Sequence, residues 1–208
     1  ITRNVPDGKY LLNKSEIEVD SKALKEGDLT PYLKQHPNKE ILGFRFHLRM
    51  YNLASPSKFN GINRFFKTNG EEPTLLDTNL IKEGSQNILL YLKSKGYYNA
   101  TVLDSIDYTG NKANVFYKIV PNTPYKIKGL TYSIEDSVIR RLVKVDSANC
   151  IITRKQHFDE AILQNERLRL ESYLRNNGFY NFSRDFITFS ADTSVGNHRT
   201  DVILTIRN

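Results

Sequence analysis

The string Tyr91-Leu-Lys-Ser-Lys-Gly-Tyr-Tyr-Asn99 returns 82 residues later as Tyr173-Leu-Arg-Asn-Asn-Gly-Phe-Tyr-Asn181. Asp77, ahead of the first string, has a counterpart in Asp159 at the same offset. Identities that recur at a fixed spacing are typical of an internal repeat, which sets the number of modules and their boundaries together. The 208-residue chain is therefore predicted to contain two copies of one module.

Both copies of the string predict the end of a helix. Asp77 and Asp159 are placed to cap the N-terminus of each helix, and Gly96 and Gly178 to end it in the left-handed conformation. We therefore interpret Gly96 and Gly178 as structural helix stops. The apolar residues between cap and stop have the spacing of one buried face: Leu80, Ile88, Tyr91 and Leu92, and then Ile162, Leu170, Tyr173 and Leu174.

Strand-like runs surround each long helix. Two runs follow each glycine and predict a hairpin, 100–108 with 113–120 and 183–190 with 201–207. A further strand, 9–19 or 125–134, and a short helix, 28–35 or 136–145, precede each long helix. The predicted class is α+β, with the order β-α-α-β-β repeated. Two prolines in 121–124 interrupt the chain between the copies, which places the predicted domains at 1–121 and 122–208.

The first copy carries an insertion. Its first strand matches that of the second copy at an offset of 115, against 82 for the later elements, which leaves 33 extra residues at about 39–71. The net charge of the chain is +7, and residues 39–70 hold six basic residues and one acidic residue. Charge and repeat alignment therefore identify the same segment.

The insertion has two interpretations. Residues 41–51 fit a helix with Ile41, Phe44, Leu48 and Tyr51 on one side, capped by Asn38 and stopped by Pro56, although alternate residues also fit a strand. Phe59, Phe65 and Phe66 add aromatic side chains further along. Either this helix enlarges the core of the first module, or it leaves a basic aromatic face for a partner protein or an anionic membrane surface. The residues assigned to that face are Phe44, Arg45, Phe46 and Arg49.

Nothing in the residue pattern predicts catalysis. The composition, 39% hydrophobic and 25% charged, is that of a globular domain, and no run is long enough for a membrane-spanning helix. The single cysteine excludes an internal disulfide, and the four histidines lack metal-ligand spacing. Phosphate-loop and serine-nucleophile motifs are also missing. We expect no enzyme, no catalytic residue, no metal site and no cofactor.

The repeated order and its glycine-aromatic helix ends resemble tandem polypeptide-transport-associated (POTRA) domains of BamA- and TamA-type outer-membrane assembly factors, the surface antigen family. Three stretches are similar to a lipoprotein branch of that family: Lys9-Tyr-Leu-Leu-Asn-Lys14, residues 37–49 and Gly70-Glu-Glu-Pro73. The resemblance implies, for each module, a three-stranded mixed sheet with two helices on one face. It also implies that the last strand is central and the second strand is an exposed edge.

The resemblance further implies a non-catalytic scaffold in the periplasm, attached to the outer membrane through residues outside these 208. Its partners would be unfolded or nascent outer-membrane proteins and accessory assembly proteins or lipoproteins. An incoming strand would pair with the edges at 101–106 and 185–189. The residues assigned to this binding are Thr101, Val102, Leu103, Phe186 and Ile187. The alternative role for Asp104, Asp107 and Asp185 is to prevent uncontrolled pairing.

Two other classes of function compete with this hypothesis. The basic aromatic insertion is also suited to nucleic acid, because arginine and phenylalanine together hold phosphates and stacked bases. We do not expect nucleic acid among the partners, and keep this as the alternative. A purely structural spacer predicts instead that Phe44, Phe46 and the edge strands are dispensable for binding.

Overall fold

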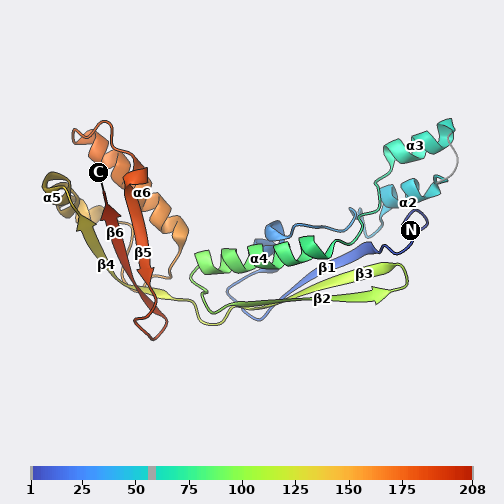
Figure 1. Cartoon of the computed structure of the whole chain (residues 1–208), viewed down its shortest axis with the longest axis horizontal. Coiled ribbons are helices and arrows are strands. Elements are labelled where there is room, and N and C mark those ends of the chain that lie inside the picture. Colours follow the sequence, from blue (N-terminus) through green and yellow to red (C-terminus); the bar gives the residue numbers. More distant parts are fainter. Residues whose placement is uncertain (1, 56–59, 208) are drawn as a thin grey trace. The chain divides into compact units, whose positions relative to one another are not determined.

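The computed structural model describes residues 2–55 and 60–207. Two compact units form: Ile1–Leu90 with Thr101–Val120, called the first unit, and Tyr91–Ala100 with Pro121–Asn208, called the second unit. Each unit holds one three-stranded mixed sheet with helices beside it, as Figure 1 shows. The predicted α+β class and the repeated β-α-α-β-β order are confirmed. Pro56 and Phe59, which the sequence analysis singled out, lie outside the described residues.

The sheet of the first unit has the order β1-β3-β2. β3 (Lys112–Val120) is central, parallel to β1 (Leu11–Val19) and antiparallel to β2 (Thr101–Thr109). A two-residue turn joins Thr109 to its partner Lys112, and Gly110 takes a φ of 55° that suits glycine. The expectation that the last strand is central and the second strand is an edge is therefore confirmed.

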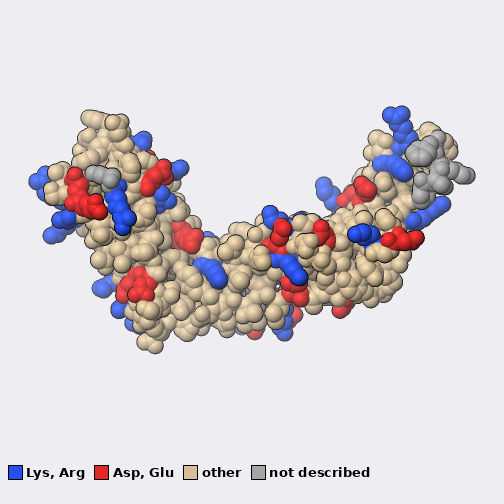
Figure 2. All heavy atoms as spheres, viewed as in Figure 1, with Lys and Arg blue, Asp and Glu red and all other residues tan. Residues whose placement is uncertain are grey.

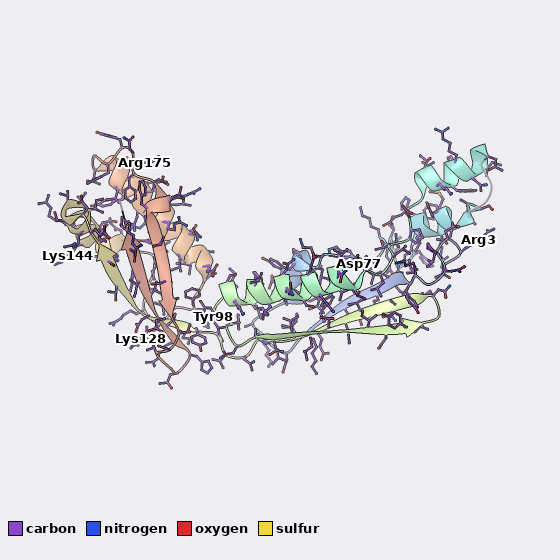
Figure 3. The ribbon with its side chains drawn as sticks, in the orientation of Figure 1. Arg3, Asp77, Tyr98, Lys128, Lys144 and Arg175 are labelled. Atoms are coloured by element: carbon purple, nitrogen blue, oxygen red, sulfur yellow. The ribbon has the colours of Figure 1, made fainter. Side chains whose placement is uncertain are left out.

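The long helix of the first unit lies along one side of this sheet (Figure 1). α4 (Thr78–Ser94) begins where predicted, because the Asp77 carboxylate accepts a hydrogen bond from the Asn79 N–H at 2.8 Å (Figure 3). The predicted helix at 28–35 is instead one turn, α1 (Glu26–Leu29), followed by the 3-10 turn η1 (Thr30–Tyr32). Pro31 explains the early end, because it has no N–H to continue the α-helical ladder.

The second unit repeats the plan with the strand order β4-β6-β5. Its elements are β4 (Lys126–Ile134), α5 (Ser137–Val145), η2 (Asp146–Asn149), α6 (Glu160–Asn176), η3 (Arg184–Phe186), β5 (Ile187–Asp192) and β6 (Arg199–Ile206). Both helices pack on the same sheet face, because one core cluster joins Ile139 and Val143 of α5, Leu170 and Leu174 of α6, and Leu204 and Ile206 of β6.

The insertion forms two short helices, and the prediction of one helix capped by Asn38 is wrong. Ile41 and Phe44 pair across a two-residue turn in which Leu42 and Gly43 have φ values of 50° and 77°, which no right-handed helix accommodates. α2 (Phe46–Leu53) and α3 (Gly61–Asn69) follow. The Asn38 side chain instead donates to the Glu72 carbonyl at 2.7 Å and accepts from the Thr74 N–H at 2.9 Å. Asn38 thus ties together the two ends of the insertion.

Among the described residues, no helix is both long enough and apolar enough to cross a membrane.

Candidate functional site

In each sheet, a segment from elsewhere in the same unit bonds to the first residues of one outer strand. The Leu12 N–H on β1 donates to the Thr74 carbonyl at 2.8 Å. On β4, the Ile127 N–H donates to the Gln156 carbonyl at 2.9 Å, and the Ile127 carbonyl accepts from the Lys155 N–H at 2.7 Å. Over residues 2–55 and 60–207, these backbone bonds reach the first residues of β1 and β4, and none of them reaches the outer edge of β2 or β5.

The open edge of β5 presents backbone groups at alternate residues. The Phe186 carbonyl accepts from the Arg207 N–H at 3.1 Å, so this pair is hydrogen-bonded toward β6. In an antiparallel ladder, hydrogen-bonded pairs alternate with pairs whose backbone groups point outward. This alternation aims the N–H and C=O groups of Ile187, Phe189 and Ala191 away from β6.

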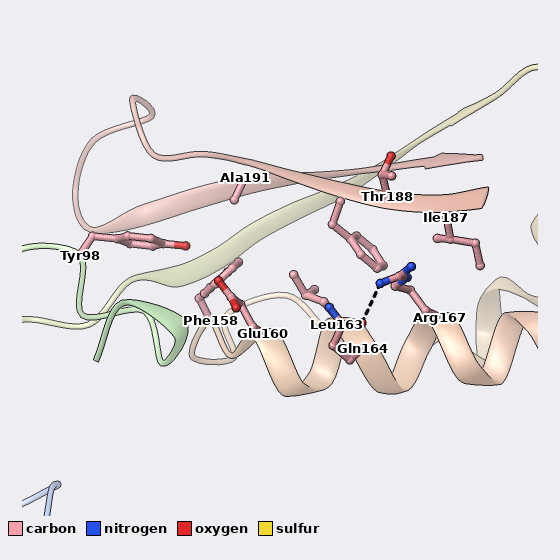
Figure 4. Close-up of a pocket in the computed structure, with 10 residues that line it drawn as sticks. Tyr98, Phe158, Glu160, Leu163, Gln164, Arg167, Ile187, Thr188 and Ala191 are labelled. Atoms are coloured by element: carbon pink, nitrogen blue, oxygen red, sulfur yellow. Dashed lines mark hydrogen bonds between the residues drawn. The ribbon is translucent and has the colours of Figure 1, made fainter. Parts of the chain in front are cut away.

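A groove of about 420 Å³ lies along this edge, between β5 and α6. Its apolar lining includes Phe158, Leu163 and Phe189. Figure 4 shows Glu160 and Arg167 rising from α6 toward β5 on either side of Leu163. The groove therefore combines an apolar lining, two opposite charges and a row of free backbone groups.

The polar side chains of the groove are held in place. Arg167 donates to the Arg184 carbonyl through Nε at 3.1 Å and Nη2 at 2.9 Å, and through Nη1 to Gln164 at 2.8 Å. Burial, and then the negative charge of Glu160 and the neighbouring Tyr125, raise the pKa of Tyr98 to about 12. The Tyr98 phenol therefore stays protonated at neutral pH and is a hydrogen-bond donor at one end of the groove.

β2 is longer than β5, and none of the pockets described for residues 2–55 and 60–207 is lined by its residues. The turn at 110–111 makes Thr109 and Lys112 a hydrogen-bonded pair, so alternation aims the backbone groups of Val102, Asp104 and Ile106 outward. Asp104 accepts a hydrogen bond from the Ser85 hydroxyl at 2.9 Å, so its carboxylate is engaged by α4.

The predicted edge residues lie in different environments. Thr101 and Leu103 are exposed, and Val102 is half-buried. The strand predicted at 183–190 begins later, at Ile187, because the Ser183 hydroxyl accepts from the Asp185 N–H at 3.2 Å and starts η3. The Phe186 ring packs on Phe182 with centroids 5.6 Å apart, and the Ile187 side chain is fully buried. Ile187 can therefore offer only its backbone to a partner.

Of the predicted residues of the insertion, some are exposed and one faces inward. Phe44 and Phe46 are exposed, and the Arg49 guanidinium lies 5.6 Å from the centre of the Phe44 ring. Arg45 turns inward, because it donates to Asn13 and forms an ion pair with Glu40 at 2.7 Å, which leaves its side chain 10% exposed. Its role in the structure is to hold the insertion against β1.

Sequence reasoning missed the groove residues Tyr98, Glu160 and Arg167. For Glu160 and Arg167 there is no sequence signal, because outward positions of α6 look like any solvated helix face until β5 lies beside them. Tyr98 recurs as Tyr180 in the repeat, but the repeat does not reveal that it lies at a groove. It also missed Ile62, and it named Phe65 without the helix α3 on which both residues lie. The spacing of Ile62, Phe65 and Phe66 at i, i+3 and i+4 is visible in the sequence and could have revealed that helix.

A buried ionic cluster in the second unit is structural. Arg169 donates to both carboxylate oxygens of Glu166, at 2.9 and 2.7 Å, and pairs with Asp146. Glu166 also accepts from the Ile151 N–H at 3.2 Å, so the cluster joins η2 to α6. Within the described part of the chain, no group of three or more His, Cys, Asp or Glu residues is placed to hold a metal ion.

Neither a protein-family model nor a curated protein matches the sequence. Among solved structures, the chain is similar to BamA from Haemophilus ducreyi lacking POTRA domains 1–3, with 14% identity and a TM-score of 0.47, over 96% of this chain and 29% of that one. It is similar to POTRA domains 1–2 of Omp85 from Anabaena, with 11% identity and a TM-score of 0.40, over 94% of both chains. It is also similar to POTRA domains 3–5 of Haemophilus influenzae BamA, with 12% identity and a TM-score of 0.37, over 99% of this chain and 100% of that one. The chain thus spans under a third of the first of these proteins.

Proposed function

We propose that this chain is the non-catalytic scaffold region of an outer-membrane protein assembly or translocation factor. It works in the periplasm, attached to the outer membrane through residues outside these 208, and captures unfolded or nascent outer-membrane proteins as an added β-strand. Accessory assembly proteins or lipoproteins are its second class of partner. The observation that carries this proposal is the open edge of β5 beside the groove formed with α6.

Backbone pairing explains how one site accepts many sequences. An added strand pairs with the outward N–H and C=O groups of Ile187, Phe189 and Ala191, and main-chain hydrogen bonds are the same for every side chain. Alternate side chains of a strand point to one face, so every second residue of the added strand faces the groove. The apolar lining of Phe158 and Leu163 therefore favours segments with alternating apolar residues.

The two charges set the length of segment that the groove holds. Glu160 and Arg167 lie seven positions apart on α6, which is about 10 Å along the helix. A strand covers that length with about three residues. Because side chains alternate, an apolar residue that faces the groove has two neighbours whose side chains point away from it.

The experiment removes an outward N–H without touching the bonds to β6. Ala191→Pro does this, because proline is tolerated on an edge strand where its nitrogen faces solvent. The matched control is Ala191→Ser, which keeps the N–H. Binding of a fluorescent peptide with alternating valine and serine is measured by anisotropy. We expect Ala191→Pro to weaken binding about 10-fold or more, and Ala191→Ser to leave it unchanged.

The same peptide methylated at alternate backbone nitrogens is the second test, and we expect it not to bind. Equal binding of the methylated peptide, or unchanged binding by Ala191→Pro, would refute strand addition to β5. If no peptide binds the wild-type chain at all, the structural spacer replaces this proposal.

A further inference from the structure

The insertion leaves most of its large apolar side chains outside the core. Leu48 of α2 is fully buried, in a cluster with Val5 and Leu11. Leu42, at the tip of the two-residue turn, is 94% exposed. The other exposed apolar residues of the segment are Ile41, Phe44, Phe46, Leu53, Ile62 and Phe65. Seven exposed large apolar residues within one short segment are more than isolated surface residues would account for.

The inner side of the two helices is held by polar side chains. Asn52 on α2 is buried, donates to the Leu48 carbonyl at 2.8 Å and accepts from the Asn4 N–H at 3.0 Å. Asn63 on α3 is buried and accepts from the Ser55 N–H at 3.0 Å. Amides therefore share the inner side of α2 and α3 with Leu48, while Phe46, Leu53, Ile62 and Phe65 are exposed. Water does not favour so many large apolar side chains on the outer side of two short helices.

The charge of the same segment has one sign. Residues 41–70 contain five Lys or Arg residues and no Asp or Glu. Arg49 on α2 and Arg64 and Lys67 on α3 are exposed, and Figure 2 shows blue spheres among tan ones over α3. Exposed apolar side chains bordered by cations complement a surface that is apolar below and anionic above.

We propose that this insertion surface, made of Leu42, Phe46, Leu53, Ile62 and Phe65 with Arg49, Arg64 and Lys67, docks on an anionic lipid bilayer. The apolar side chains enter the boundary between headgroups and acyl chains, and the cations contact the lipid phosphates. The insertion surface contains no residue of β2 or β5, so this proposal goes beyond polypeptide capture and stands independently of it.

The shape and chemistry of the surface favour lipid over nucleic acid. Leu42, Leu53 and Ile62 are aliphatic and cannot stack on bases, whereas acyl chains accept them. Leu42 stands at a turn tip, and the described pocket of the insertion is lined by polar residues such as Asn13, Glu40 and Arg45. A protruding apolar tip suits a deformable lipid surface.

Co-sedimentation with vesicles tests the proposal. The 208-residue chain is mixed with vesicles of phosphatidylcholine alone and with vesicles containing one-third phosphatidylglycerol. We expect binding to the anionic vesicles only, weaker at high salt.

Three double variants identify the side chains that bind. Ile62→Ser with Phe65→Ser should weaken vesicle binding about 10-fold or more. Arg64→Gln with Lys67→Gln should weaken it by about fivefold for each charge. The matched control, Leu90→Ser with Val145→Ser, removes two similarly exposed apolar residues outside the insertion and should change nothing.

A fluorescent reporter provides a second measurement that does not depend on loss of binding. The chain has no tryptophan, so Phe65→Trp introduces a single one on the insertion surface. Its emission should shift to the blue when anionic vesicles are added. The matched reporter Leu90→Trp, exposed on α4, should not shift.

Three results would overturn the proposal: no binding to anionic vesicles, equal loss of binding in the Leu90 and Val145 control, or no shift for Phe65→Trp. Single-stranded DNA that displaces the chain from vesicles and binds through Arg64 and Lys67 would assign the surface to nucleic acid instead. Ala191→Pro should retain vesicle binding, so that failure of strand capture and failure of membrane docking are distinguishable.

Discussion

At the scale of single residues, Tyr117 is an unusual feature of the first core. It is fully buried on β3, and in the described part of the chain its hydroxyl has no hydrogen-bond partner. Gly84 on α4 lies beside it, and a Cβ there would be in ordinary contact with the hydroxyl oxygen at 3.5 Å. Burial, and then the negative charge of Asp104, raise the pKa of Tyr117 to about 12.

Removing that hydroxyl should stabilise the protein. An unpaired buried hydroxyl costs about 1–3 kcal/mol, so we expect Tyr117→Phe to raise the free energy of unfolding at pH 7 by about 1 kcal/mol. Urea unfolding followed by circular dichroism measures the change. Tyr108→Phe, which alters an exposed ring on the neighbouring strand, is the control and should have no effect. A less stable Tyr117→Phe variant would show that the hydroxyl makes a favourable contact.

The raised pKa of Tyr117 predicts a dependence on alkaline pH. The unfolded chain loses the phenol proton near pH 10, before the folded chain does at about 12. The stability that depends on the neutral phenol is therefore complete below pH 10 and is lost as the pH rises through about 12. Between these values the wild-type chain should lose stability more steeply than Tyr117→Phe in the same urea experiment. Parallel curves would contradict this assignment.

At the scale of secondary-structure elements, the two long helices end by the same device in different surroundings. The Tyr97 N–H donates to the Leu92 carbonyl and the Phe179 N–H to the Leu174 carbonyl, next to glycines with φ values of 84° and 98°. A Cβ at Gly96 would lie 2.9 Å from the Phe158 carbonyl oxygen, whereas nothing lies within 4 Å of one at Gly178. Gly96 thus ends a helix and also permits a close backbone approach.

The two glycines should therefore respond differently to alanine. Gly178→Ala should lower the free energy of unfolding by about 1–2 kcal/mol, which is the penalty of the left-handed conformation alone. Gly96→Ala should lower it by about 1–3 kcal/mol more, because the Phe158 backbone must move. Thermal or urea unfolding of the paired variants measures the difference. Equal losses of stability would mean that the Phe158 backbone moves away from the added methyl group at no cost in free energy.

At the scale of the whole molecule, residues 91–100 belong to the second unit although they precede its predicted start at 122. The Tyr125 N–H donates to the Gly96 carbonyl at 2.9 Å, and Lys95 pairs with Asp159 at 2.8 Å. The Tyr98 ring packs on Phe158 with centroids 5.6 Å apart. The domains 1–121 and 122–208 remain a proposal, and these contacts make it testable.

We expect a fragment of residues 122–208 to fold but to be less stable than the same unit in the whole chain. The loss should be about 2 kcal/mol, mainly from the missing Tyr98 ring. Amide hydrogen exchange of α6, measured in the fragment and in the whole chain, reports the difference. Tyr98→Ala in the whole chain should reproduce most of the loss. Identical exchange in fragment and chain would place the boundary at 122.

The sequence alone was sufficient for the repeat, the order of elements, the helix caps at Asp77 and Asp159 and the stops at Gly96 and Gly178. These features depend on residues within a few turns of one another, through periodicity and backbone hydrogen bonding. The insertion resisted the same reasoning, because its apolar spacing fits both a helix and a strand. The positive φ values of Leu42 and Gly43 then decided for a turn.

The candidate sites depended on the tertiary structure. Which edges are open follows from contacts between distant residues, such as Leu12 with Thr74 and Ile127 with Gln156. Whether Arg45 faces solvent or Glu40, and whether Ile187 offers a side chain or only a backbone, likewise depends on what packs against each residue. Local sequence patterns specify the elements, but exposure belongs to the folded arrangement, because a side chain is buried by residues far from it along the chain.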